Sequence, residues 1–139
     1  MTQKKQILIV EDNEFNRAML SEILSHEYQV LEAENGQVAL DILQQHKNSI
    51  SLILLDVVCD YVQGYYFARP MPVMDGHEAT KRIRALENPV LSSIPIIAMT
   101  ANAFDEDKKA ALDSGMNGFI SKPIVVDEVV EALKGVILS

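Results

Sequence analysis

The stretch Leu52-Ile53-Leu54-Leu55-Asp56 decides the fold, because a short continuous apolar run that stops at a carboxylate is typical of a strand buried on both faces. A second run of this kind, Ile7-Leu8-Ile9-Val10, stops at Glu11-Asp12. Buried strands of this type belong to parallel sheets, in which the carboxyl ends of the strands meet at one edge. We therefore expect Glu11, Asp12 and Asp56 to converge at that edge.

Further apolar runs alternate with segments of helical period, which is the pattern of strand and helix units in a parallel sheet. Strands are predicted at residues 6–10, 29–33, 51–57, 94–99 and 118–121. Helices are predicted after Asn13, after Asn35-Gly36, and over residues 76–86, 105–114 and 126–137. Phe15, Leu20 and Leu24 are expected on the inward side of the first helix. Right-handed crossovers then predict a doubly wound, flavodoxin-like α/β fold with five parallel strands in the order 2-1-3-4-5.

The composition predicts one domain over residues 1–139, because 139 residues with 48% hydrophobic content support a single well-buried core. The net charge of −8 disfavours a nucleic-acid partner. Cys59 is the one cysteine, which excludes an intrachain disulfide and suits a reducing cytoplasm. No stretch approaches the roughly 20 apolar residues of a membrane helix. We expect a cytoplasmic protein with neither a nucleic-acid nor a membrane partner.

The residues that follow the predicted strands indicate phosphoryl chemistry. Thr100 follows the fourth strand and Lys122 follows the fifth, so both join the acidic residues at the carboxyl edge. Three carboxylates repel one another unless a cation holds them, and Mg²⁺ fits because it prefers oxygen ligands. Asp56 is the candidate nucleophile for in-line attack on a phosphoryl donor, and Lys122 and Thr100 are candidate partners for the phosphoryl oxygens.

Five motifs resemble those of response-regulator receiver domains, in the same order and at the same strand ends. They are residues 8–13 (Leu-Ile-Val-Glu-Asp-Asn), 54–57 (Leu-Leu-Asp-Val), 71–76 (Met-Pro-Val-Met-Asp-Gly), 98–103 (Ala-Met-Thr-Ala-Asn-Ala) and 121–123 (Ser-Lys-Pro). The resemblance implies a phosphoacceptor domain of a two-component phosphorelay. Its expected partner is a sensor histidine kinase or a phosphotransfer protein, whose phosphohistidine phosphorylates Asp56. Such a domain catalyses its own phosphoryl uptake and is not a turnover enzyme.

The resemblance also implies roles for individual residues. Mg²⁺ is expected on Glu11, Asp12, Asp56 and the backbone carbonyl of Val58. Thr100 is expected to move toward the phosphoryl group while Phe119 changes rotamer as a switch. The output surface, which is also a candidate homodimer interface, is then the face formed by the fourth helix, the fifth strand and the fifth helix.

An interruption follows Asp56, because receiver domains place Met-Pro two residues after the aspartate and here residues 57–70 intervene. The extra residues, 59–70, are dense in strand-favouring aromatic side chains, which predicts an inserted strand or hairpin. Residues 59–72 resemble the last barrel strand of EAL-type cyclic-di-GMP phosphodiesterases, and we interpret the insertion as an engineered or recombinant graft in preference to a natural insertion, which leaves open whether phosphorylation of Asp56 is impaired. Exposed aromatic residues there predict a second possible homodimer interface. One strand cannot assemble the two-metal site of that family, so no phosphodiesterase activity is expected.

Two alternative functions remain open from the sequence. A haloacid-dehalogenase-like phosphatase would share the nucleophilic aspartate, but that family has a second aspartate two residues later, where Val58 stands. A non-signalling chimeric scaffold would keep the fold while the insertion disables Asp56. The path of residues 57–72 relative to Asp56 distinguishes the scaffold from the working phosphoacceptor.

Overall fold

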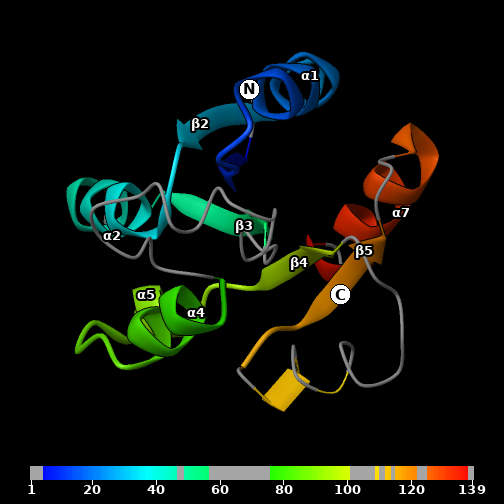
Figure 1. Cartoon of the computed structure of the whole chain (residues 1–139). Coiled ribbons are helices and arrows are strands. Elements are labelled where there is room, and N and C mark those ends of the chain that lie inside the picture. The colour runs from blue at the N-terminus through cyan, green and yellow to red at the C-terminus, as the bar shows by residue number, and fades with distance from the viewer. Residues whose placement is uncertain are drawn as a thin grey trace, which may run out of the picture.

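The computed structural model describes residues 5–46, 49–56, 76–100, 109, 112–113, 115–121 and 125–137, and these form an α/β structure (Figure 1). The strands are β1 (Gln6–Val10), β2 (Gln29–Ala33), β3 (Ile50–Asp56), β4 (Ile96–Thr100) and β5 (Gly118–Ser121). The helices are α1 (Glu14–Leu24), α2 (Gly36–Gln45), α4 (Gly76–Arg84), α5 (Pro89–Ser92) and α7 (Val126–Ile137). None of these helices is both long and apolar enough to cross a membrane.

The strands form one parallel sheet in the order β2-β1-β3-β4-β5, which confirms the predicted topology. β1 lies between β2 and β3, and its last residue, Val10, pairs with Ala33 on one side and Leu55 on the other. Because all five strands run in the same direction, their carboxyl ends lie at one edge of the sheet. The residues that immediately follow β1 are therefore brought next to the end of β3.

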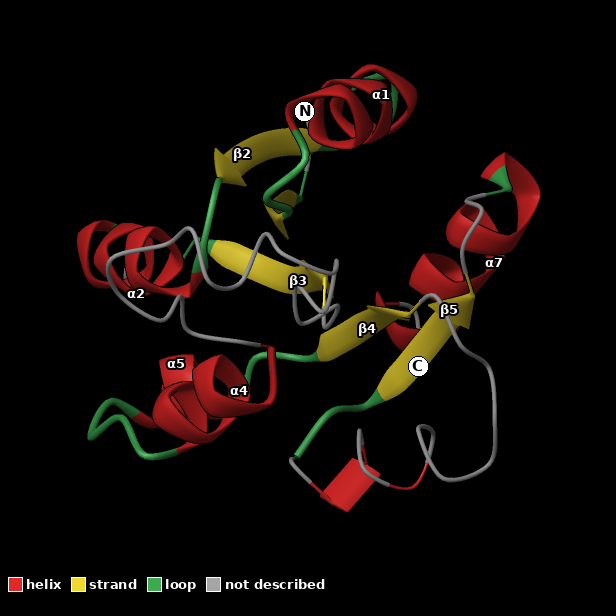
Figure 2. Cartoon of the chain, viewed as in Figure 1, coloured by secondary structure: helices red, strands yellow, loops and turns green. Residues whose placement is uncertain are grey.

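Helices lie on both sides of the sheet (Figure 2), and the sheet separates two hydrophobic clusters, as the alternation of side chains along each strand requires. In β1, Leu8 and Val10 pack with residues of α2, α4 and α5, while Ile7 and Ile9 pack with residues of α1 and α7. Both faces of the sheet are thus covered by helices. This arrangement explains why β1 and β3 carry the unbroken apolar runs 7–10 and 52–55 instead of alternating with polar residues.

Side-chain caps fix where the first two helices begin. Asn13 Oδ1 accepts a hydrogen bond from the backbone N–H of Asn16 (3.0 Å), and Asn35 Oδ1 accepts one from that of Val38 (2.9 Å). Each cap satisfies a helix N–H that has no partner within the helix. Both helices therefore start directly at the carboxyl edge of the sheet, so their N-termini and the strand ends lie together.

The structure differs from the expectations in Phe15, in several element bounds and in one additional helix; α4, for example, ends at Arg84, two residues earlier than predicted. Phe15 was expected to face the core, but its side chain is 80% exposed, while Leu20 and Leu24 are buried as expected. β4 starts at Ile96, two residues later than predicted, because Ile94 and Pro95 connect it to α5. α5 is a short helix that the sequence analysis did not predict, with Asn88 as its N-cap and Pro89 in its first turn.

Candidate functional site

The carboxyl edge of the sheet brings together the acidic residues predicted from the sequence. Glu11 and Asp12 follow β1, and Asp56 is the last residue of β3, one step beyond the Val10–Leu55 pair. Carboxylate oxygens of Glu11, Asp12 and Asp56 all lie within 4.8 Å of one another. We call these three residues the acidic cluster. Its three residues differ in solvent exposure: Glu11 is 1% exposed, Asp56 is half-buried and Asp12 is exposed.

The donor set of the acidic cluster fits a hard divalent cation. Mg²⁺ binds oxygen ligands at about 2.1 Å, so two oxygens on opposite sides of one ion are about 4.2 Å apart. The oxygen separations in the acidic cluster, all within 4.8 Å, reach slightly beyond this limit, so a small rotation of the exposed Asp12 side chain would bring all three carboxylates onto one ion. Carboxylates also suit Mg²⁺ better than a softer metal, which would favour nitrogen or sulfur ligands.

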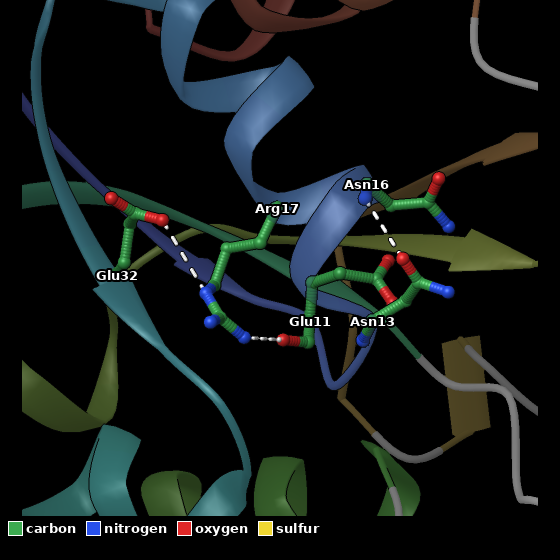
Figure 3. A network of polar contacts seen from close by, with 5 residues as sticks. All are labelled: Glu11, Asn13, Asn16, Arg17 and Glu32. Atoms are coloured by element: carbon green, nitrogen blue, oxygen red, sulfur yellow. Dashed lines mark hydrogen bonds and ion pairs between the residues drawn. The ribbon is translucent and has the colours of Figure 1, made fainter.

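Polar contacts hold the loop that carries the first two acidic residues (Figure 3). The backbone N–H of Glu11 donates to the carbonyl of Ala33 (3.0 Å), and the backbone N–H of Asn13 donates to Glu11 Oε1 (3.1 Å). The buried carboxylate of Glu11 is thereby oriented by the backbone that follows it. Arg17 and Glu32 belong to the same network, although the sequence analysis did not single them out.

A sequence signal for Arg17 does exist. Arg17 is the fourth residue of α1, in the first turn, where the helix macrodipole disfavours a positive charge. The cost of a cation there is only about 0.3–1 kcal/mol, so an arginine at this position is a weak signal of a compensating acceptor. The sequence alone does not show that the acceptor is on β2, because that depends on how the sheet packs.

The other predicted site residues are described to different extents. Thr100 ends β4 and pairs with Ser121 of β5, so its backbone is at the same edge; its side chain lies outside the described structure. Phe119 is half-buried, pairs with Ala98, and packs against the cluster under α2 and α4. Val58, Lys122 and the predicted insertion, 59–70, lie outside the described residues.

The sequence profile described as "Response regulator receiver domain" matches residues 7–134, which covers nearly the whole sheet and its helices. The chain belongs to this family. The receiver domain is 38% identical over 128 residues to the sensor histidine kinase RcsC of Salmonella typhi. That match covers 91% of this chain but 12% of RcsC, so this receiver domain spans about an eighth of that relative's length.

Solved structures of receiver domains have the same fold. The receiver domain of the sensor histidine kinase PA1611 from Pseudomonas aeruginosa, solved with a magnesium ion in its active-site cleft, is 32% identical with a TM-score of 0.74. The match covers 99% of this chain and 100% of that one. The Ssk1 receiver domain of Saccharomyces cerevisiae, solved in complex with the histidine phosphotransfer protein Ypd1, is 29% identical with a TM-score of 0.76, covering 97% and 90% of the two chains.

Proposed function

We propose that this receiver domain accepts a phosphoryl group on Asp56 from the phosphohistidine of a sensor histidine kinase or phosphotransfer protein. The observation that carries the proposal is the acidic cluster, in which Asp56 ends a central strand within 4.8 Å of Glu11 and Asp12. Asp56 is half-buried, so it is not enclosed by the described part of the chain. The complex of Ypd1 with the Ssk1 receiver domain supports a phosphotransfer partner.

In the proposed reaction, a carboxylate oxygen of Asp56 attacks phosphorus in line with the bond to the donor nitrogen. An acyl phosphate forms, the nitrogen–phosphorus bond breaks, and its electron pair returns to the imidazole. Glu11, Asp12, Asp56 and the Val58 carbonyl are the proposed Mg²⁺ ligands, and the ion would neutralise charge on the phosphoryl oxygens. Lys122 is the proposed partner for one further oxygen, and the Thr100 hydroxyl for another.

We propose Phe119 as the switch residue that reports phosphorylation. Its strand, β5, is next to β4, which carries Thr100, and its side chain packs on the hydrophobic cluster under α2 and α4. Movement of Thr100 toward the phosphoryl group would open space for a different Phe119 rotamer. The output would then be a population shift at the face formed by β5, α7 and the helix expected at residues 105–114, most of which lies outside the described residues; homodimerisation is also proposed at this face.

The insertion, 59–70, is proposed to interrupt a single domain of residues 1–139 and to derive from a barrel strand of an EAL-type phosphodiesterase. Two observations support this reading: Met-Pro follows the insertion as it does in receiver domains, and aromatic residues fill the insertion itself. One grafted strand would bring no phosphodiesterase activity. If the insertion blocks Asp56, the protein is a chimeric scaffold without signalling function. A cytoplasmic location, where histidine kinases donate phosphoryl groups, completes the proposal.

Acetyl phosphate with Mg²⁺ tests the proposal through intact-mass measurement. We expect one phosphoryl adduct on the full chain and none on Asp56→Asn, which keeps the shape of the side chain but removes the nucleophilic carboxylate. Asp12→Ala should abolish Mg²⁺ binding in a calorimetric titration. A variant without residues 59–70 distinguishes a competent site that the insertion disables from a site that cannot be phosphorylated at all. Labelling of this variant alone would show that the insertion disables a competent site, and labelling of neither protein would refute the phosphoacceptor function.

A further inference from the structure

Arg17 connects three segments at the acidic cluster. Its side chain folds back from the first turn of α1, and Nη1 donates a hydrogen bond of 2.8 Å to the backbone carbonyl of Glu11. Nε of the same guanidinium lies 3.3 Å from Glu32 Oε1 on β2 (Figure 3). We call Arg17, Glu32 and the Glu11 carbonyl the Arg17 clamp.

The clamp acts on the peptide group that joins the first two residues of the acidic cluster. The Glu11 carbonyl belongs to the peptide bond with Asp12, so fixing this oxygen also fixes the direction in which Asp12 leaves β1. The Glu11 N–H is already bound to the carbonyl of Ala33, the neighbour of Glu32 on β2. Both backbone polar groups of Glu11 are therefore tied to the end of β2, one directly and one through Arg17.

An ordinary surface ion pair would not have this effect. Glu32 is 45% exposed, and exposed pairs contribute little to stability. The Arg17 side chain, however, is only 18% exposed, and its bond to the Glu11 carbonyl is short, partly buried and charge-assisted. The planar fork of a guanidinium binds both acceptors at once, which the single ammonium of a lysine cannot do in the same geometry.

We propose that Arg17 is a positioning residue that fixes the Glu11–Asp12 backbone so that the two carboxylates are held in place for Mg²⁺. This inference rests on the proposed function for the metal, but the backbone restraint itself does not. A positioning role and a purely electrostatic role predict opposite changes in Mg²⁺ affinity when Arg17 is replaced. If the charge of Arg17 were its main effect, removing it would strengthen Mg²⁺ binding, because a cation near the site repels the ion. If the clamp matters, removing it weakens Mg²⁺ binding.

The test compares Arg17→Met, which removes the charge and the fork, with Arg17→Lys, which keeps the charge and loses the fork. Lys134→Met is the control, because it removes one positive charge from the last turn of α7, which ends at the opposite edge of the sheet. Calorimetric titration should give Mg²⁺ dissociation constants about tenfold larger for both Arg17 variants than for the unmodified chain, a loss that is common for residues that orient metal ligands. Unchanged or tighter binding in both would overturn the proposal.

A second measurement does not depend on the metal. Amide hydrogen exchange without Mg²⁺ should be at least about tenfold faster at Glu11 and Asn13 in both Arg17 variants than in Lys134→Met, since local opening becomes easier when the clamp is lost. Equal exchange rates would refute the clamp. If the unmodified chain binds no Mg²⁺, the proposed metal site fails, and the exchange rates alone decide whether Arg17 restrains this backbone.

Discussion

Replacing Arg84 with methionine should destabilise the fold by about 3 kcal/mol, because this side chain joins four segments through hydrogen bonds. Nε donates to the carbonyl of Gly115 (3.0 Å), and Nη1 donates to those of Ser92 (2.9 Å) and Ile94 (2.8 Å). Nη2 donates to Asn117 Oδ1 (2.8 Å), which also accepts from the backbone N–H of Ile96, the first residue of β4 (2.9 Å). Arg84 thereby connects the end of α4 to α5, to the start of β4 and to the segment before β5.

The magnitude follows from the number of bonds and from the burial of the guanidinium. A hydrogen bond with a charged group contributes about 1.5–3 kcal/mol, but bonds that share one side chain are not additive. The partly buried guanidinium has lost some of its hydration, and this burial lowers the pKa of Arg84 from its usual value. That desolvation offsets part of the gain. The remaining loss of about 3 kcal/mol corresponds to a fall in Tm of about 10 °C for a chain of this size.

Urea denaturation followed by circular dichroism measures the effect. Lys81→Met is the matched control, because Lys81 is exposed in the last turn of the same helix and its removal deletes the same charge. The free energy of unfolding of Arg84→Lys should lie between those of Arg84→Met and Lys81→Met, since the single ammonium of lysine replaces the planar set of guanidinium donors. Free energies of unfolding for Arg84→Met and Lys81→Met that agree within about 1 kcal/mol would show that the Arg84 hydrogen bonds do not stabilise the fold.

Two further predictions concern stability. Gly115 has φ +104° and an added Cβ would lie 3.1 Å from Arg84 Cγ, so Gly115→Ala should cost about 1–2 kcal/mol in urea denaturation. Gly135→Ala is the control and should stabilise α7 by up to about 1 kcal/mol, because nothing lies within 4 Å of the added Cβ. A loss of stability in Gly135→Ala as large as that in Gly115→Ala would show that the conformation of Gly115 is not the cause. Burial first, and then Glu27, raise the pKa of Tyr28 above 10.0, so ionisation is harder in the folded state. The stability that comes from keeping Tyr28 neutral is present below pH 10 and is lost as the pH rises through the folded-state pKa. Tyr28→Phe should therefore lose less stability than the unmodified chain when the pH is raised through this window. Equal losses in the two proteins would exclude a raised Tyr28 pKa.

The order of the strands and the location of the acidic cluster were predictable because they depend on local patterns. Continuous apolar runs specify strands buried on both faces, and parallel strands bring their carboxyl ends to one edge. Glu11 and Asp56 could therefore be placed together although they are far apart in the sequence. The capping role of Asn13 was equally local, since a cap needs only the next turn of backbone.

Helical period alone wrongly predicted that Phe15 faces the core. It placed this residue on the apolar side of α1 with Leu20 and Leu24, but Phe15 lies in the first turn of α1, where the helix leaves the carboxyl edge of the sheet, and its side chain is 80% exposed among the described residues. The short helix α5 was missed for a related reason. Four residues are too few to show a period, and the helix is stabilised by its Asn88 cap and by the contact of Leu91 with the core.

The sequence by itself determined the family, the parallel sheet and the acidic cluster, because these follow from the spacing of residue types along the chain. Only the tertiary structure decided the partners of Arg17 and Arg84. Each guanidinium binds acceptors on segments distant in the sequence: Arg17 reaches β2, and Arg84 reaches the residues before β5. Long flexible side chains select such acceptors after the sheet and helices have packed, so no local pattern specifies them.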